Sequence, residues 1–327
     1  AEAPELCRQI GALGPERLLV LDHSENQVFE ISGELRERFP KLQLVPLIAD
    51  IRDQLRIRSI MQRYKPYAVF HAAAHKHVPL MEENIIEAIT NNVLGTRNIV
   101  EAALDADVRH LVSISTDKAV RPTSIMGATK RVAEKIVLHA ALTDGRNFVS
   151  VRFGNVLGSD GSVVPLFQRQ LERGGPLTVT DPEVTRYFMT IPEASSLVVQ
   201  AGAMGGRGQV YVLDMGKPVK ILELARQMIE LSGHTEEEIP IAFVGSRAGE
   251  KMHEELWNEG EAVGPTSHPK ISRAARAPIN AEWLDEQLAV LERLAGSGDV
   301  TGVVSHLSAM VAAPVRSGSA VLEDTLH

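Results

Sequence analysis

The sequence is poor in the features that mark several large classes of protein. It has one cysteine, Cys7, among 327 residues, so an internal disulfide is excluded and a reducing compartment is indicated. It has no run of about 18 apolar residues and no signal-peptide pattern, so we expect no membrane span in this chain. These absences predict a cytoplasmic protein.

Positive charge is also scarce. The chain has 34 Lys and Arg residues against 42 Asp and Glu residues, which gives a formal net charge of -8. Without a basic run, this balance argues against nucleic acid as a partner. His75 and His77 lie close together in the sequence, but no matching cysteine or carboxylate pattern accompanies them, so we expect no metal site.

Hydrophobic residues make up 44% of the chain and are arranged in regular alternating segments. Short apolar runs predict strands, and helical spacing between them predicts helices of 12 to 24 residues. The expected strands are 17–21, 42–50, 67–74, 109–115 and 147–156, and the expected helices are 24–38, 53–64, 81–104 and 125–142. This alternation predicts an α/β fold with a Rossmann-like, doubly wound parallel sheet.

The pattern becomes irregular after residue 156, with helices expected near 192–204, 219–232 and 280–296 and a Gly, Ser and Ala-rich tail. We therefore expect a dinucleotide-binding domain over 1–156. A smaller C-terminal substrate-binding lobe, with elements returning to the core, is expected over 157–315. Residues 316–327 are expected to be disordered.

One element of a dinucleotide-binding fold is missing. Such a fold begins with a central strand and a G-x-G-x-x-G turn that leads into a helix. No such turn precedes the first expected helix, near residues 5–12. We therefore expect the dinucleotide-binding domain of this chain to be incomplete at its N-terminal side, with two strand edges left open.

The residues with the most chemical potential lie in 114–131, at the end of a strand and the start of a helix. Thr116, Asp117 and Lys118 follow the strand, and Met126 and Lys130 lie one helical turn apart. Ligands of open α/β sheets bind beyond the carboxyl ends of the strands. An acid beside an amine at this edge indicates proton transfer, although an isolated Asp-Lys pair is more often a solvated loop. Met126 alone indicates core packing.

Other strand ends carry candidates with two interpretations. Asp22 could bind the ribose hydroxyls of an adenosine or cap the following helix. Ala72, Ala73 and Ala74 would let a flat cofactor approach the backbone or would simply pack a helix against the sheet. Asn92 is an unfavourable residue within a helix, so it indicates either backbone bonding near the site or a solvated surface.

Five motifs give a more specific resemblance. They are HAAAHKHVPLME (71–82), NNVLGTRNIVEAA (91–103), STDKAVRPTSIMGATKR (115–131), VRFGNVLGSDGSVVPLF (151–167) and TDPEVTRYFMTIPEA (180–194). In this order the chain resembles the bacterial nucleotide-sugar 4,6-dehydratases of polysaccharide biosynthesis, of the UDP-N-acetylglucosamine type. These enzymes are extended short-chain dehydrogenases/reductases.

The resemblance implies a reaction and roles for the central residues. A 4,6-dehydratase oxidises C4 of the sugar, eliminates water across C5 and C6, and returns the hydride to C6. Lys118 would be the base and Asp117 the acid of the elimination. Lys130 would bond the nicotinamide ribose. Met126 holds the place of a tyrosine and cannot transfer a proton, so Thr116, Asp117 or an ordered water would handle the C4 hydroxyl proton.

The resemblance also implies ligands and a setting. The cofactor would be NAD, with NADP as the alternative, and the substrate a UDP-sugar. The cofactor residues would be Asp22, Asp50, Ile51, Ala72, Ala73, Ala74, Asn92 and Lys130. The substrate residues would be Lys76, His77, Asn155, Arg186, Arg247 and Glu250, with Arg152 in the same set of motifs. A homo-oligomer is implied, and the chain could be the cytoplasmic part of a membrane-anchored protein.

Two other functions stay open. A C4 or C5 epimerase could use the same scaffold, although epimerases of the common type keep the tyrosine that Met126 replaces. A chain without the glycine-rich turn could also be a catalytically inactive, cofactor-free fragment that only binds or assembles.

Overall fold

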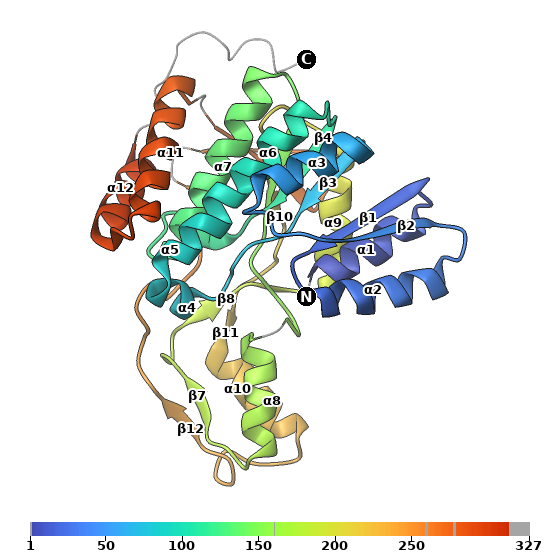
Figure 1. Cartoon of the computed structure of the whole chain (residues 1–327). Coiled ribbons are helices and arrows are strands. Elements are labelled where there is room, and N and C mark those ends of the chain that lie inside the picture. Colours follow the sequence, from blue (N-terminus) through green and yellow to red (C-terminus); the bar gives the residue numbers. More distant parts are fainter. Residues whose placement is uncertain (1, 160, 259–260, 277–278, 314–327) are drawn as a thin grey trace.

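The computed structural model describes residues 2–159, 161–258, 261–276 and 279–313, and its helices cover both faces of a mostly parallel sheet (Figure 1). From one edge to the other, this sheet contains β13 (Ala262–Pro265), β14 (Ile271–Ala275), β10 (Val210–Leu213), β5 (Asn147–Arg152), β4 (His110–Ile114) and β3 (Ala68–His71). The last four strands are parallel, and β14 and β13 are added in antiparallel pairings. The expected α/β fold is confirmed.

Two further parallel strands form a sheet of their own. β1 (Arg17–Asp22) pairs with β2 (Gln43–Ile48), beside α1 (Glu2–Ala12) and α2 (Glu25–Arg38). Within the described ranges, no strand pairs with the second edge of β1 or of β3. The parallel strands are thus divided between two sheets.

The helices make three layers with the central sheet. α3 (Gln54–Tyr64), α6 (Thr96–Asp105) and α7 (Ile125–Thr143) lie over one face, and α9 (Ile191–Met204) lies over the other with α1 packed against it. α11 (Ala281–Gly296) and α12 (Val300–Ala312) pack outside α7 and the segment before α6. Each face of the sheet has its own apolar core.

A smaller lobe lies below this body in Figure 1. It contains α8 (Val163–Glu172), α10 (Ile221–Leu231) and two short strand pairs. β7 (Leu177–Val179) pairs with β12 (Ile241–Phe243), and β8 (Thr185–Arg186) pairs with β11 (Val219–Lys220). The lobe has a separate core that includes Phe167, Leu177 and Ile229. β6 (Asn155–Val156) and β9 (Phe188–Met189) pair at its junction with the body.

The expected helix over 81–104 is wrong as a single element. The chain forms α4 (Val78–Glu83), α5 (Ile85–Ala88), a π-helical segment over Ile89–Gly95, and then α6. The Asn84 amide donates to the Leu80 carbonyl at 2.9 Å and separates α4 from α5. The π-helical segment carries Asn92, whose side chain bonds to the loop after β3. A π-helical turn of this kind is often found at a functional site.

The expected Gly, Ser and Ala-rich tail after residue 296 is also wrong in part. Residues 300–312 form α12, whose N-cap Asp299 accepts a hydrogen bond from the Gly302 amide. Val303, Leu307 and Met310 are buried against α7 and α11. The expectation of disorder over 316–327 lies outside the described residues.

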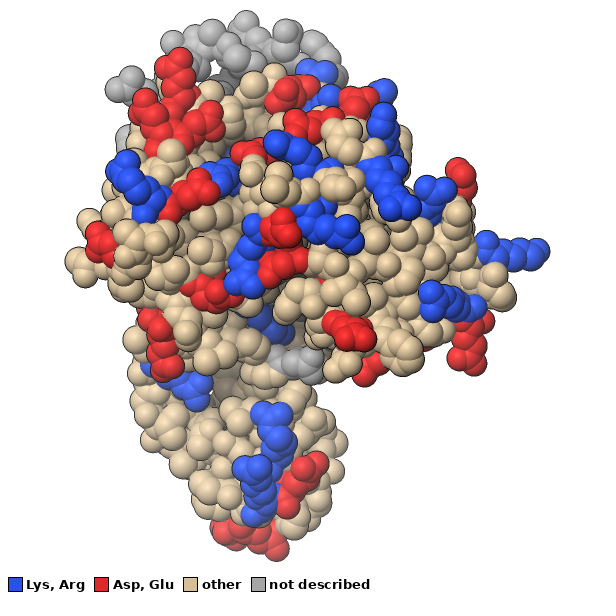
Figure 2. All heavy atoms as spheres, in the orientation of Figure 1, with Lys and Arg blue, Asp and Glu red and all other residues tan. Residues whose placement is uncertain are grey.

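Acidic and basic side chains are interspersed over the face drawn in Figure 2. That face therefore carries no extended field of one sign. Within the described part of the chain, every helix is too short or too polar to cross a bilayer.

Candidate active site

The candidate residues come together because the parallel strands end at one edge. Asp22 ends β1, and Asp50 follows β2 by two residues. Ala72 follows β3, Thr116 follows β4 by two residues, and Asn155 follows β5 by three. Ligands bind at this edge in open α/β sheets.

The turn after β4 holds the expected acid and amine. Thr116 caps a short 3₁₀ turn over Asp117–Ala119 and donates from its hydroxyl to Asp117 Oδ1 at 2.9 Å. The Lys118 ammonium donates to the same carboxylate oxygen at 2.9 Å and to Asn155 Oδ1 at 3.2 Å. The structure therefore brings Thr116, Asp117, Lys118 and Asn155 into one hydrogen-bonded group.

Backbone contacts fix this turn against its neighbours. The Asp117 amide donates to the Phe153 carbonyl at 3.1 Å, which extends the contact between the ends of β4 and β5. A Cβ on Gly154 would lie 3.1 Å from Asp117 Oδ2 and 2.8 Å from the Cβ of Tyr187. A Cβ on Gly127, in the first turn of α7, would collide with the Lys118 carbonyl oxygen. These two glycines permit the close approach of chains that the site requires.

Glu254 is a site residue that the sequence analysis missed. Its side chain is buried, and Oε1 lies 3.7 Å from the Lys118 ammonium. Oε2 lies 3.8 Å from the Lys251 ammonium and has no hydrogen-bond partner in the structure. The only signal in the sequence was a carboxylate three residues after Lys251. Nothing in that spacing indicates that the segment folds back onto the turn after β4.

Burial and charge act in opposite directions on this cluster. Burial lowers the pKa of the Lys118 amine, but the Asp117 and Glu254 carboxylates raise it, and the net shift is upward. Burial raises the pKa of the Glu254 carboxyl, with Lys118 acting against it. A base needs a pKa near the working pH, so Lys118 is protonated until its surroundings change.

Lys130 and Met126 lie on α7 with different roles. The Lys130 ammonium is buried and donates to the Ile114 carbonyl at the end of β4 at 2.6 Å. Burial lowers its pKa to about 8. Met126 is 3% exposed and packs with Met81 and Ala88. Met126 therefore belongs to the core, whereas Lys130 reaches the strand end.

The expected adenosine residues have local partners. Asp22 accepts a hydrogen bond from the Ser24 amide at 2.8 Å, and Ser24 caps α2. Asp50 is held by Arg52, which lowers the pKa of the Asp50 carboxyl. Ile51 is buried against Gly95. Asp22 thus orders the turn after β1 without itself being the N-cap.

The residues after β3 and in the π-helical segment also meet. Asn92 is fully buried, accepts from the His75 amide at 2.8 Å, and donates to the His75 carbonyl at 3.0 Å. It also donates to the Thr129 hydroxyl on α7. Ala73 is exposed between the partly buried Ala72 and Ala74. The surface interpretation of Asn92 is therefore wrong, because this amide shapes the loop that carries the alanines.

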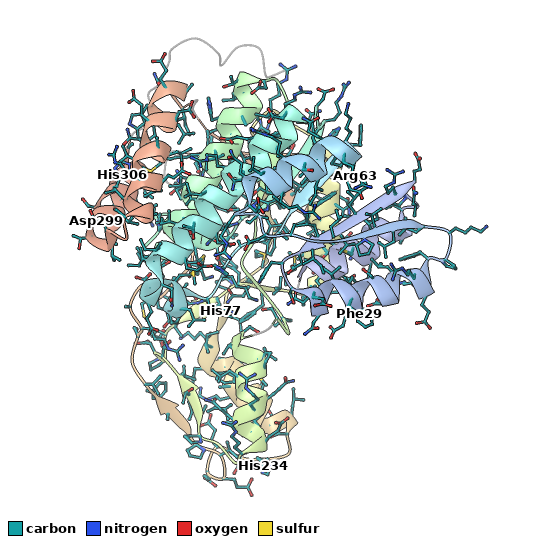
Figure 3. All side chains as sticks on the ribbon, in the orientation of Figure 1. Phe29, Arg63, His77, His234, Asp299 and His306 are labelled. Carbon is teal, nitrogen blue, oxygen red and sulfur yellow. The ribbon has the colours of Figure 1, made fainter. Side chains whose placement is uncertain are left out.

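The expected substrate residues lie at the junction with the lobe. Arg186 is buried and donates to Glu250 Oε1 at 2.8 Å. Arg247 is exposed in the same loop as Glu250. Lys76 is exposed, whereas His77 lies between the body and the lobe, as Figure 3 shows. A Cβ on Gly161 would collide with the His77 ring, so this histidine packs against the loop after β6.

Arg152 cannot take the phosphate role that its motif suggests. Its side chain is fully buried and forms two hydrogen bonds with Glu134, at 2.7 and 2.9 Å. It also donates to Glu261 at 2.9 and 3.1 Å, and Arg276 contacts both carboxylates. Arg152 therefore ties α7 to the segment before β13. Among the described residues, no group of three or more His, Cys, Asp or Glu could hold a metal ion.

The chain matches the family described as "Polysaccharide biosynthesis protein" over residues 3–276. It is 54% identical over 271 residues to the "Capsular polysaccharide biosynthesis protein CapD" of Staphylococcus aureus, which covers 82% of this chain and 45% of that protein. It is 53% identical over 268 residues to the "Probable polysaccharide biosynthesis protein EpsC" of Bacillus subtilis, with the same two coverages. The chain thus spans less than half the length of these curated relatives.

Solved structures show the same fold. Pen from Bacillus thuringiensis is 34% identical, with a TM-score of 0.75, over 82% of this chain and 84% of that one. DesIV from Streptomyces venezuelae, a dTDP-glucose 4,6-dehydratase solved with NAD bound, is 22% identical with a TM-score of 0.67, over 78% and 84% of the two chains. At that identity the second likeness concerns the fold alone.

Proposed function

This chain belongs to the polysaccharide biosynthesis protein family, and on that premise we propose that it is a nucleotide-sugar 4,6-dehydratase that uses NAD and acts on UDP-N-acetylglucosamine. One observation carries the proposal. Asp117, Lys118 and Asn155 form one hydrogen-bonded group at the end of β4, while Met126 is buried in the core. Acid–base chemistry at this site then rests on the turn after β4.

The residues present fit part of a nicotinamide dinucleotide. The buried Lys130 amine at the end of β4 suits the nicotinamide ribose, and Asp22 at the end of β1 suits the adenosine ribose. The small side chains of residues 72–74 leave room for a flat ring beside the backbone. When bound, the cofactor supplies reversible hydride transfer with C4 and then C6 of the sugar.

The protein's own residues would handle the protons. Asp117 takes the C4 hydroxyl proton through the Thr116 hydroxyl, which already donates to its carboxylate. The neutral amine of Lys118 then takes the C5 proton, and Asp117 gives its proton to the departing C6 hydroxyl. The C5–H electrons form the C5–C6 double bond as the C6–O bond breaks, so the proton lost at C4 leaves in the water. Lys118 returns a proton to C5 as the hydride reaches C6.

The nucleotide would lie between the body and the lobe. Arg247 and Arg186 are two basic residues of this junction, and a guanidinium suits a diphosphate through its fork of donors. Arg247 is exposed and therefore accessible to a ligand, whereas Arg186 is already bonded to Glu250. Arg247 is therefore the stronger candidate for phosphate contact.

The test is product formation by the full protein with NAD and UDP-N-acetylglucosamine. We expect a UDP-4-keto-6-deoxy sugar, detected by mass spectrometry and NMR. Lys118→Ala should abolish the product while substrate binding is kept, and Lys41→Ala, at an exposed site before β2, is the matched control. A C4 or C5 epimer without loss of water would establish the epimerase alternative. Turnover by Lys118→Ala equal to the control would overturn the base assignment.

A further inference from the structure

The elimination requires a neutral amine at Lys118, yet the turn after β4 holds this amine as an ammonium. Asp117 bonds it at 2.9 Å and Glu254 lies 3.7 Å away, so two carboxylates favour its charged form. The substrate must approach an amine that has already released its proton. A nearby group must therefore accept that proton before the elimination.

Glu254 is placed to accept it. The residue is 7% exposed, and its side chain lies between two ammonium groups, those of Lys118 and Lys251. Lys251 is itself held by the Val120 carbonyl at 2.6 Å. One oxygen of Glu254 has no hydrogen-bond partner in the structure. A buried carboxylate with an unsatisfied oxygen is stabilised when it gains a proton.

The other charged groups around Glu254 also affect the pKa of its carboxyl. Asp117 raises the pKa of the Glu254 carboxyl, while Lys118, Arg186 and Lys251 lower it. Arg186 is bonded to Glu250. Burial is the largest of these influences, and the pKa of the Glu254 carboxyl is raised. The Asp117 and Glu254 carboxylates in turn raise the pKa of the Lys118 amine, so the charge of Lys118 and the charge of Glu254 depend on each other.

We propose that Glu254 is the proton partner of Lys118: it positions the ammonium in the resting site and takes one of its protons before the elimination. This inference rests on the proposed dehydratase function. The Lys118 proton moves to the Glu254 carboxylate, and the neutral amine takes the C5 proton. After Lys118 returns a proton to C5, Glu254 returns the stored proton to Lys118. The cycle therefore needs no net proton from solvent.

A pH profile distinguishes this role from a merely structural one. While the pair holds its protons internally, kcat does not depend on pH near neutrality. In Glu254→Gln the ammonium must lose its proton to water, so kcat should rise about tenfold per pH unit below the pKa of Lys118. Glu254→Asp keeps a carboxylate and should keep the flat profile at a lower kcat. A C5-deuterated substrate should show an isotope effect on kcat in Glu254→Gln.

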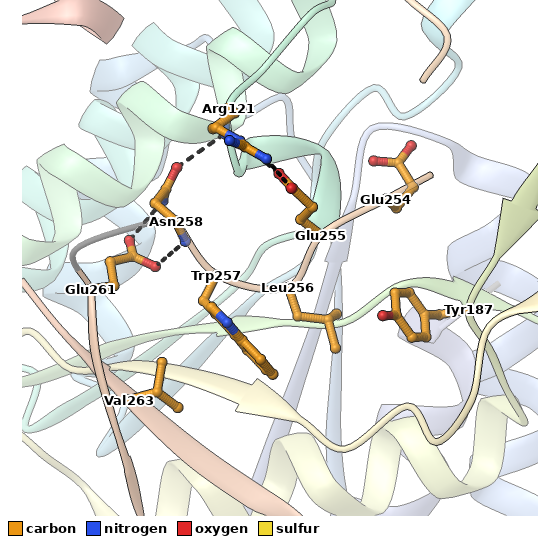
Figure 4. Close-up of a pocket in the computed structure, with 9 residues that line it drawn as sticks. All are labelled: Arg121, Tyr187, Glu254, Glu255, Leu256, Trp257, Asn258, Glu261 and Val263. Atoms are coloured by element: carbon orange, nitrogen blue, oxygen red, sulfur yellow. Dashed lines mark hydrogen bonds and ion pairs between the residues drawn. The ribbon is translucent and has the colours of Figure 1, made fainter. Parts of the chain in front are cut away.

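Glu255→Gln is the matched control. Glu255 lies beside Glu254 at the same cavity of about 490 Å³, but it pairs with Arg121 (Figure 4). Its profile should stay flat. If kcat of Glu254→Gln is independent of pH, or if Glu255→Gln shows the same slope, the proposal is wrong.

A second measurement does not depend on turnover. In protein labelled with ¹³C at lysine Cε, NMR should show a lower pKa for Lys118 in Glu254→Gln than in the wild type, because one neighbouring negative charge is lost. An unchanged pKa would overturn the pairing. If the pKa falls but the wild type forms no dehydrated product, the dehydratase function fails and the pairing stands. If product forms but the pKa and the profile are unchanged, the function stands and this inference fails.

Discussion

At the residue scale, the geometry of the site depends on a glycine at position 127. Gly127 lies in the first turn of α7, and any Cβ there would collide with the backbone carbonyl of Lys118. Backbone cannot move aside as a flexible side chain can. The 3₁₀ turn that carries Asp117 and Lys118 is therefore seated on α7 only because residue 127 is glycine.

We predict that Gly127→Ala displaces this turn. The variant should lose at least about tenfold in kcat, since small displacements of reacting groups are costly, while substrate binding in the lobe is less affected. Gly33→Ala is the matched control because Gly33 is exposed on α2 with no atom within 4 Å of its added Cβ. That control should gain about 0.5–1 kcal/mol of stability from better helix propensity. A Gly127→Ala enzyme with the wild-type kcat would show that the turn tolerates the shift.

The residue scale also shows what the sequence could foretell about the site. Thr116, Asp117, Lys118 and Asn155 are predictable as neighbours because each lies at the end of a parallel strand. Glu254 was not predictable, because it reaches Lys118 from a segment without helix or strand, 136 positions along the chain. The phosphate role suggested for Arg152 failed for the same reason, since its partner Glu261 also lies between β12 and β13.

At the element scale, α7 is joined to the C-terminal part of the chain by buried charge. Arg152 on β5 bonds both Glu134 on α7 and Glu261, and all three side chains are at least nine-tenths buried. Removing one partner of a buried pair leaves an uncompensated charge and costs about 3–5 kcal/mol. This group therefore fixes the elements around the site rather than binding a ligand.

We predict that Arg152→Met lowers the free energy of unfolding by about 3–5 kcal/mol, measured by urea denaturation. Arg58→Met is the control, because Arg58 forms a half-exposed ion pair with Asp105 on the surface, worth about 0–1 kcal/mol. Equal effects of the two variants would contradict a structural role for the buried group.

The effect of Arg152→Met should also depend on pH. Burial already raises the pKa of the Glu134 carboxyl, and loss of Arg152 removes a charge that lowers it. A carboxyl with a raised pKa in the folded state destabilises the fold above that pKa, and the penalty is lost as the pH falls below it. The difference between Arg152→Met and the wild type should therefore shrink as the pH falls from neutrality toward the ordinary pKa of a glutamate carboxyl. A constant difference would show that Glu134 does not carry the penalty.

Element boundaries were predictable where one local signal dominates. α2 and α7 begin within one residue of the expected starts, directly after Ser24 and Ser124. Each of these two serines caps its helix and accepts a hydrogen bond from an amide three residues on. The interruptions of the helix over 81–104 were not predictable. The Asn92 side chain in its π-helical segment bonds to His75 and Thr129, and these contacts exist only in the folded chain. α12 was missed because its Gly, Ser and Ala content outweighed a cap at Asp299 and buried positions at helical spacing.

At the scale of the whole molecule, the parallel strands form two sheets that differ in size and in the apolar core packed against them. Among the described residues, the main sheet has six strands and a large apolar core on each face. The β1–β2 sheet has two strands, and its buried core consists of Val20, Ile31 and Leu35. Two-stranded sheets are marginal without packing against other elements. The proposed cofactor would bridge the two parts, from Asp22 on β1 to Lys130 beside β4.

We predict that the β1–β2 unit opens more readily than the main sheet. In native-state hydrogen exchange, amides of β1 and β2 should exchange at least about tenfold faster than those of β4 and β5. The free energy of local opening is lower for β1 and β2 because fewer buried apolar contacts must be broken. Saturating NAD should slow exchange in β1 and β2, because it binds only when both parts are in place and so raises the free energy of opening by RT ln(1 + [L]/Kd). Equal protection of the two sheets without ligand would show that they unfold as one unit. Protection of β1 and β2 that NAD leaves unchanged would instead contradict a cofactor that contacts both β1 and the end of β4.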